Sequence, residues 1–187
     1  MISRCPKSPT SSIADHREVE DMFHRLMSPG APCGNERRAL VDRVIIELVR
    51  HAVTEEAHLY PAARRYLPDG DAVADREIDD HNEVERLMKD LENLDTDDPR
   101  FEHTLARLIA DVRAHVEDEE TRLFPSLREH TTRTDRTMLG GKVQAAKASA
   151  PTRPHPKAPS TAPAITALAP GIGLVDRARD ACTGRGR

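Results

Sequence analysis

The sequence of 187 residues predicts an all-α protein, an up-down-up-down four-helix bundle followed by a flexible C-terminal tail. Apolar residues recur at three- and four-residue steps over four long segments, as on the inner face of an amphipathic helix. The chain has three phenylalanines, two tyrosines and no tryptophan, whereas a β-sandwich or barrel usually uses more aromatic residues. A repeat with an offset of 64 or 65 residues indicates two copies of one helical hairpin, which together make a four-helix bundle.

The repeat contains two motifs. DHREVE at 15–20 matches DHNEVE at 80–85 in five of six positions. HAVTEEAHLYP at 51–61 matches HVEDEETRLFP at 115–125 in the histidine, both glutamates, the leucine and the proline. In each motif a glutamate follows a histidine by four residues, so the two side chains lie on one face of a helix. Four such faces turned to a common centre would form a cage of imidazoles and carboxylates.

Proline and glycine mark the ends of the predicted helices. Ser28-Pro29-Gly30 and Pro68-Asp69-Gly70 are breakers, and Pro99 suits the first position of a helix. Pro61 and Pro125 fall inside helical spacing, where each should kink the helix or start a new turn. Because the connections are short, consecutive helices should be antiparallel neighbours. The four helices are predicted over about 12–27, 35–66, 71–94 and 99–130.

Composition divides the chain into four parts. We expect a disordered, Ser/Pro-rich leader over 1–10 and the bundle over 11–131. A short helical extension is predicted over 132–148. The rest, 149–187, is a Pro/Ala-rich basic tail, linker-like to about residue 170, with a short helix over 173–181.

The net charge of −4 conceals an asymmetry, because residues 132–187 carry ten Lys or Arg and only three Asp or Glu. The rest of the chain is therefore acidic, and we expect no nucleic acid partner. The basic tail suits a protein partner that the sequence does not identify. The three cysteines are scattered without a CxxC pair, and we find no apolar leader or membrane-spanning run. We therefore expect a cytoplasmic protein that does not bind a membrane.

The histidines and glutamates point to a transition metal. Imidazole with carboxylate suits iron, manganese or zinc better than calcium or magnesium. The order histidine then glutamate, four residues apart, differs from the Glu-x-x-His of ferritin-like diiron proteins and from the HExxH of zinc proteases.

These motifs, in this order, resemble the hemerythrin-like HHE cation-binding family and its bacterial members over about residues 12–131. The resemblance implies a non-heme diiron centre inside an up-down-up-down bundle, with two iron ions preferred over manganese or zinc. It implies that Glu55 and Glu119 bridge the two ions. Carried over by position, the metal ligands are His16, His51, Glu55, His81, His115 and Glu119.

Three residues keep two roles open. Glu20 and Glu85 follow His16 and His81 by four residues, and each is either an additional ligand or a neighbour that supports one. Glu85 stands where the oxygen-carrying hemerythrins have a second histidine. Tyr60 either packs in the core, which its counterpart Phe124 favours, or lines the centre as a redox-active phenol.

The function we expect is binding of a small ligand, oxygen, nitric oxide or peroxide, at the diiron centre for sensing, stress defence or iron handling. One alternative is an iron-responsive regulatory interaction module without small-molecule chemistry. Another is a diiron enzyme that removes peroxide, so both binding and turnover stay open.

Overall fold

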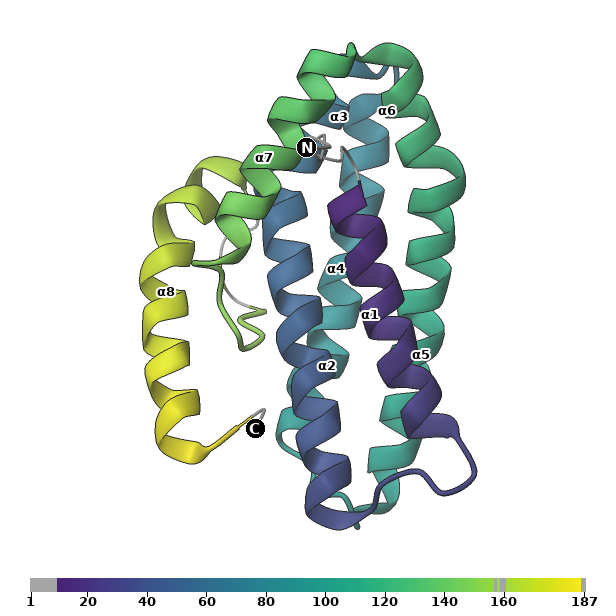
Figure 1. The fold of residues 1–187 in the computed structure, drawn as a ribbon, viewed down its shortest axis with the longest axis vertical. Coiled ribbons are helices and arrows are strands. Elements are labelled where there is room, and N and C mark those ends of the chain that lie inside the picture. Colours follow the sequence, from purple (N-terminus) through teal and green to yellow (C-terminus); the bar gives the residue numbers. More distant parts are fainter. Residues whose placement is uncertain (1–9, 157, 159–160, 186–187) are drawn as a thin grey trace, which may run out of the picture.

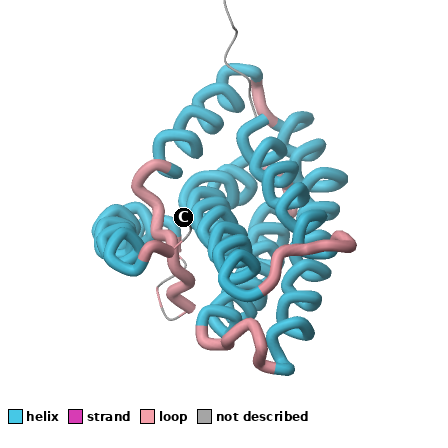
Figure 2. The backbone as a smooth tube through the Cα atoms, turned by 60° about the horizontal axis from the view of Figure 1, so that its bottom comes forward, coloured by secondary structure: helices cyan, strands magenta, loops and turns pink. Residues whose placement is uncertain are grey.

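The computed structural model describes residues 10–156, 158 and 161–185. All regular structure in this part is helical, and Figures 1 and 2 show long helices side by side with no strand in the described residues. The elements are α1 (Thr10–Met27), α2 (Gly34–Thr54), η1 (Glu55–Leu59), α3 (Tyr60–Tyr66), α4 (Gly70–Glu92), α5 (Pro99–Asp118), η2 (Glu119–Leu123), α6 (Phe124–His130), α7 (Arg133–Lys147) and α8 (Ala162–Thr183).

The predicted four-helix bundle is confirmed. The first column is α1, and the second consists of α2, η1 and α3. The third column is α4, and the fourth consists of α5, η2 and α6. Successive columns run in opposite directions (Figure 1). Each column begins and ends within a few residues of the predicted helix. The leader predicted over 1–10 lies outside the described residues, apart from Thr10 at the start of α1.

The two columns that carry the longer motif, those of α2 and α5, are interrupted at corresponding places by a π-helical turn. The backbone N–H of Tyr60 donates to the carbonyl of Glu55, and that of Phe124 donates to Glu119, each five residues back. Pro61 and Pro125 follow directly in the first turn of α3 and α6, where a missing N–H is tolerated. The wider turn adds a residue to the helix and often marks a functional site.

Close backbone approach explains the glycine in the connection between the two hairpins. At Gly70, where α4 begins, an added Cβ would lie 2.1 Å from the backbone oxygen of Ala63 in α3. Only glycine lets α4 start against α3 at this distance. Helix α5 instead begins with a side-chain cap, since the Asp98 carboxylate accepts a hydrogen bond from the backbone N–H of Arg100 at 2.9 Å.

The apolar core forms two clusters along the bundle. The larger one joins the four columns on one side of the four motif histidines, and Phe23, Ile45, Met88 and Leu108 lie deep within it. The smaller one, on the other side, includes Tyr60 and residues of α3, η2 and α6. The histidines therefore lie between two apolar layers.

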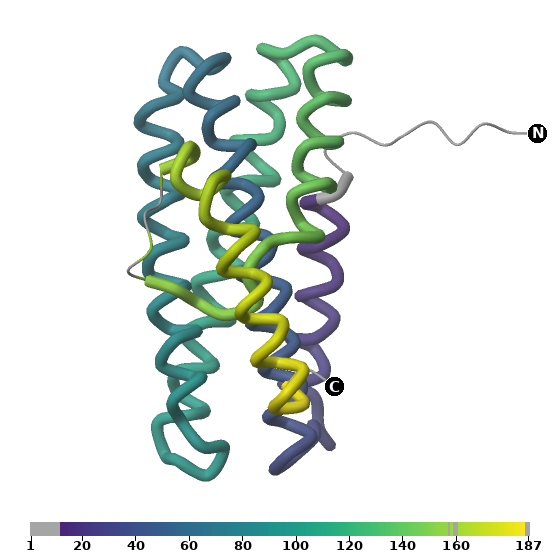
Figure 3. Tube along the Cα trace, turned by 90° about the vertical axis from the view of Figure 1, so that its left-hand side faces the viewer, coloured from purple at the N-terminus to yellow at the C-terminus, as the bar shows by residue number. Residues whose placement is uncertain are grey.

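The C-terminal tail differs from the prediction. The extension α7 is found as expected, but the prediction of a linker to about residue 170 is wrong, because α8 begins at Ala162. The helix runs over 22 residues, through Pro170, instead of covering only 173–181. Alanine-rich sequence favours a helix, and tertiary packing outweighs the cost of one internal proline. Figure 3 shows α8 crossing the bundle in front of α2.

Gly173 shows how closely α8 lies against the loop that precedes it. An added Cβ there would lie 2.3 Å from the backbone oxygen of Ser149 and 2.7 Å from that of Ala150. The segment that follows the bundle thus consists of α7, a loop and α8, and α8 packs against that loop. We call residues 133–156 and 161–185 the C-terminal extension.

Candidate metal centre

Each of the four columns places one histidine at the centre of the bundle. His16, His51, His81 and His115 are at most 6% exposed, and Glu55 and Glu119 are fully buried. The helical spacing of four residues puts each glutamate directly above the histidine of its own motif. The structure therefore brings together the six residues that the resemblance implied as ligands.

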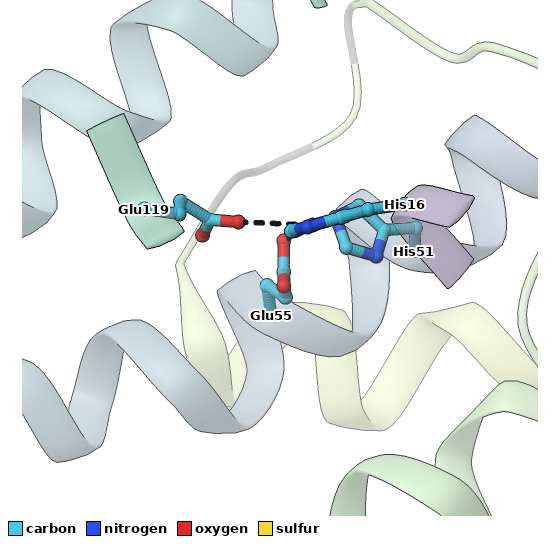
Figure 4. Close-up of side chains that lie close together, drawn as sticks. All are labelled: His16, His51, Glu55 and Glu119. Carbon is cyan, nitrogen blue, oxygen red and sulfur yellow. Dashed lines mark hydrogen bonds and ion pairs between the residues drawn. The ribbon is translucent and has the colours of Figure 1, made fainter. Parts of the chain in front are cut away.

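The first group of donor atoms comes from α1, α2, η1 and η2. The Nε2 atoms of His16 and His51 lie 3.3 Å apart. His51 Nε2 is 3.0 Å from Oε2 of Glu55, and His16 Nε2 is 3.3 Å from Oε2 of Glu119. Figure 4 shows the four side chains converging on one point.

The second group comes from α4 and α5 and uses the same two carboxylates. The Nε2 atoms of His81 and His115 lie 3.1 Å apart. Oε2 of Glu55 lies 3.7 Å from His81 Nε2, and Oε2 of Glu119 lies 3.8 Å from His115 Nε2. Each carboxylate thus faces one histidine of either pair, which is the arrangement that a bridging carboxylate needs.

The donor set fits a pair of cations. Ligand atoms bound at about 2.1 Å on perpendicular axes lie about 3 Å apart, close to the nitrogen–nitrogen distances in both pairs. Both oxygens of Glu55 and Oε2 of Glu119 are buried without a hydrogen-bond partner among the described residues. Buried carboxylates without partners are costly, and metal ions between the histidines would satisfy them.

Two further carboxylates hold the far nitrogens of two histidines. Glu120, next to Glu119, accepts a hydrogen bond from Nδ1 of His16 at 2.9 Å. Glu56, next to Glu55, does the same for Nδ1 of His81 at 3.0 Å. An Nδ1 proton leaves the Nε2 lone pair free to face the centre, so these glutamates set the tautomer that metal binding requires.

The other two histidines also have carboxylates near Nδ1. Asp15 lies 3.8 Å from His51 Nδ1 and Asp80 lies 4.0 Å from His115 Nδ1, close enough for each carboxylate to attract a protonated imidazole. Lys147 of α7 forms an ion pair with Asp15 at 2.8 Å. The C-terminal extension thereby reaches a residue directly behind the centre.

Glu77 belongs to the site and escaped the sequence analysis. It is fully buried on α4, and its Oε2 lies 3.2 Å from Nδ1 of His115. Its counterpart in the first hairpin is Ser12, so the repeat gives no sign of it. The signal that could have found it is spacing, since Glu77 precedes His81 by four residues on the same helix face.

Tyr60 is a second departure from the symmetry of the repeat, again in the half of the centre that contains His81 and His115. Its side chain is completely buried, and its hydroxyl lies 2.9 Å from Nε2 of His81 and 3.5 Å from Oε1 of Glu119. Phe124, at the corresponding position, stacks on the His16 ring with centroids 6.0 Å apart. Tyr60 both packs in the core and lines the centre.

The electrostatics of the chain favour positive charge in this cage. Burial opposes protonation of His51, but Glu55 and Asp15 outweigh it and raise the pKa to about 10. Burial likewise opposes protonation of His115, yet Glu119 and Asp80 raise its pKa well above the usual value. Burial and the charges on His115 and His51 lower the pKa of His81. In the metal-free chain the carboxylates therefore favour the protonated forms of His51 and His115.

Glu20 and Glu85 lie outside the groups of candidate ligand atoms in the described residues. Glu20 pairs with Arg113 of α5 through contacts of 2.7 and 3.1 Å. Glu85 accepts a hydrogen bond from the backbone N–H of His155 at 2.7 Å. Both side chains hold another segment instead of facing the centre, and we leave them out of the ligand set.

The geometry agrees with a comparison to protein families. Residues 13–127 match the model of the hemerythrin HHE cation binding domain, which is more than half of the chain. The chain belongs to the hemerythrin HHE cation-binding family. The matched segment contains all four histidines of the candidate centre, together with Glu55 and Glu119.

Two proteins show distant similarity to this hemerythrin-family chain. An uncharacterized hemerythrin-like protein of Schizosaccharomyces pombe is 25% identical over 167 residues, which are 89% of this chain and 81% of that protein. A DNA nickase of Nostoc is 27% identical over 134 residues, 71% of this chain but only 37% of the nickase.

A solved structure shares the fold of this hemerythrin-family chain. The crystal structure of a hemerythrin HHE cation binding domain-containing protein from Mycobacterium kansasii superposes with a TM-score of 0.63 at 21% identity, covering 76% of this chain and 86% of that one. None of the helices in the described residues has the length and apolarity that crossing a membrane requires.

Proposed function

We propose that the chain binds two iron ions at this centre and there takes up a small ligand, oxygen, nitric oxide or peroxide, for sensing, stress defence or iron handling. The observation that carries the proposal is the pair of carboxylates shared between two histidine pairs. His16 and His51 would hold one ion, His81 and His115 the other, and Glu55 and Glu119 would bridge them. Bound iron supplies a redox-active Lewis acid.

The chain itself prepares the site for such ligands. Glu56 and Glu120 hold the Nδ1 protons of His81 and His16, so that both Nε2 lone pairs face inward. The two apolar layers enclose the donor atoms from both ends of the bundle. Tyr60 places a hydroxyl donor beside His81, where it can hydrogen-bond to an anionic or oxygen-containing ligand.

Metal analysis tests the proposal. Protein reconstituted with ferrous iron and desalted should retain about two irons per chain, as expected for a two-metal site. A variant with His51→Ala and His115→Ala should lose most of this iron, because each substitution removes a donor from one histidine pair. Its control carries His103→Ala and His130→Ala, two exposed histidines, and should keep the parent's iron content.

Absorption spectra of the loaded protein before and after adding nitric oxide, azide or peroxide then test ligand binding. A parent protein that retains no iron, or a double variant with unchanged iron, would contradict the proposal.

A second candidate, an iron-responsive interaction module, is favoured by one contact. Lys147 of the C-terminal extension pairs with Asp15, which faces His51, so occupancy of the centre can influence how the extension packs. Amide hydrogen exchange in α7 and α8 should then differ between iron-loaded and chelator-treated protein. Equal exchange in the two samples would rule this candidate out.

A further inference from the structure

The duplication of the hairpin produces two corresponding faces on the bundle, one between α1 and α5 and one between α4 and α2. Each face carries a cavity, and many residues that the bundle contributes to one wall have their repeat counterparts in the other wall. The pairs are Arg17 and Asn82, Val19 and Val84, Glu20 and Glu85, Phe23 and Met88, Arg113 and Val49, Val116 and Ala52, Glu117 and Val53, and Glu120 and Glu56.

The cavity on the α1/α5 face reaches the centre. It has a volume of about 410 Å³ and is lined by all four histidines of the candidate metal centre. Apolar side chains, Val19, Phe23 and Val112 among them, form much of its wall. The mostly apolar wall favours small uncharged molecules over hydrated anions, because an uncharged molecule gives up less hydration on entry.

Two ion pairs along this cavity join α1 to the column formed by α5 and η2. Arg113 of α5 binds Glu20 of α1 through 2.7 and 3.1 Å contacts. Arg17 of α1 binds Glu120 of η2 at 2.9 Å. These side chains are only partly buried, and exposed ion pairs of this kind are weak enough to open transiently.

The corresponding cavity on the α4/α2 face is nearly filled. Its volume is about 80 Å³, and of the four histidines only His81 lines it. Residues of the C-terminal extension form its outer wall, including Pro151, Ile165 and Leu168. Figure 3 looks onto this side of the molecule, which α8 crosses.

Bundle residues that the extension covers are apolar where their counterparts on the α1/α5 face are charged, as expected for a covered surface. Val49 and Val53 stand where the other hairpin has Arg113 and Glu117. Glu85, the counterpart of Glu20, accepts the backbone N–H of His155 at 2.7 Å. The two glutamates therefore have corresponding roles. Glu20 holds the Arg113 side chain across the α1/α5 face, and Glu85 holds the backbone at His155 across the α4/α2 face.

Buried ion pairs attach the extension beside this face. Arg153 lies 2.6 Å from Asp180 and 3.6 Å from Glu92 of α4, and Arg185 lies 2.7 Å from Glu92. Both arginines are largely buried, and Lys147 adds its pair with Asp15. The basic extension thus packs on an acidic bundle through specific contacts.

We propose that the duplication made two equivalent entrances to the centre, that the C-terminal extension closes the α4/α2 entrance, and that small uncharged ligands enter between α1 and α5 past the Glu20–Arg113 pair. This inference rests on the proposed function, because it concerns access to the same centre. It makes Glu20 and Glu85 residues that control access.

A matched pair of substitutions at Glu117 and Val53 tests which entrance is used. Glu117→Phe narrows the α1/α5 entrance, and Val53→Phe adds bulk at the corresponding position of the covered one. Association of nitric oxide with the iron-loaded protein, followed by stopped-flow absorption, should slow on the order of tenfold in Glu117→Phe. Val53→Phe should associate at the parent's rate, and both variants should retain the parent's iron content.

Two further variants test the contacts that Glu20 and Glu85 make at the two entrances. Glu20→Ala should speed nitric oxide association, because Arg113 loses its partner at the open entrance. Glu85→Ala should raise amide exchange at His155 and its neighbours, measured on metal-free protein, without raising exchange in the buried parts of α1 and α5. That second measurement does not depend on iron or on any ligand.

The outcomes separate the two proposals. A parent that binds no iron defeats the proposed function, while the exchange experiment still tests the docking of the extension. A parent that binds iron, with nitric oxide association slowed by Val53→Phe and not by Glu117→Phe, overturns the assignment of the entrance. Unchanged exchange at His155 in Glu85→Ala overturns the assignment of Glu85 as the residue that holds the extension.

Discussion

Glu120 accepts a hydrogen bond at 2.9 Å from Nδ1 of His16, a residue 104 positions earlier in the chain. Glu56 repeats the contact with His81 at 3.0 Å. Each bond runs from the second glutamate of one hairpin's motif to the first histidine of the other hairpin. The two hairpins are thus joined by the contacts that orient the candidate ligands, and the double glutamate of the motif has two tasks. The first glutamate faces the centre and the second holds a histidine.

This relationship predicts a loss of metal affinity without loss of ligands. Glu120→Gln should weaken binding of iron at the centre by about 10–100-fold, because His16 loses the carboxylate that fixes its tautomer and orientation. Competition with a chelator of known affinity measures the change. Glu18→Gln, an exposed glutamate on the same α1 helix as His16, is the control and should bind iron as the parent does. Equal affinities in all three proteins would remove the assigned role of Glu120.

The asymmetry at Tyr60 predicts a change confined to one half of the centre. Tyr60→Phe removes a buried hydroxyl that contacts His81, and should lower the free energy of unfolding by about 1 kcal/mol. It should also alter the nuclear magnetic resonance signals of the His81 ring in metal-free protein more than those of His16. Phe124→Tyr tests the matching position. A larger effect of Tyr60→Phe on His16 than on His81 would contradict the contact described here.

The raised pKa values predict how the stability of the metal-free protein depends on pH. The folded-state pKa of His51 is about 10 and its unfolded value about 6.5, so its stabilising contribution is complete below pH 6.5 and is lost as the pH rises toward 10. Glu56 also makes the folded state less stable as the pH rises, because burial and the charge of Glu85 raise its pKa to about 8. The melting temperature of chelator-treated protein should therefore fall between pH 6.5 and 10.

Loading with metal should weaken this dependence, because a cation then replaces the protons that His51 would otherwise hold. Calorimetry of the loaded and metal-free protein across the pH range makes the comparison. A metal-free melting temperature that rises from pH 6.5 to 10 would contradict the proposed protonation of the cage.

The backbone contact at Gly70 predicts a site where even alanine is not tolerated. Gly70→Ala would put a Cβ 2.1 Å from the Ala63 carbonyl oxygen, and should destabilise the protein by about 1–3 kcal/mol through backbone shifts. Gly141→Ala in α7 has open space around the new Cβ and should instead stabilise by roughly 0.5–1 kcal/mol, as expected in a helix interior. Denaturant unfolding measures both, and a neutral Gly70→Ala would contradict the close approach of α3 and α4.

Local patterns were sufficient for the bundle and for the four histidine–glutamate pairs, and the resemblance to the family selected six of those eight residues as candidate ligands. A histidine and a glutamate four residues apart share a helix face whatever surrounds them, and a repeated hairpin has few ways to bury two such faces. Glu77 could not be found through the repeat, because Ser12 occupies the corresponding position. The course of the C-terminal extension was also beyond local patterns, since Pro170 argues against the helix that packing stabilises.

The sequence by itself determined the fold class, the positions of the four columns and the face on which each histidine lies, because these depend on spacing within single helices. Only the tertiary structure decided what Glu20, Glu85, Glu56 and Glu120 do, since their partners come from other helices and from the extension. The two halves of the repeat share their motifs along the chain. They differ in space because α8 covers one of them, and the course of α8 follows from long-range packing that its own local pattern does not predict.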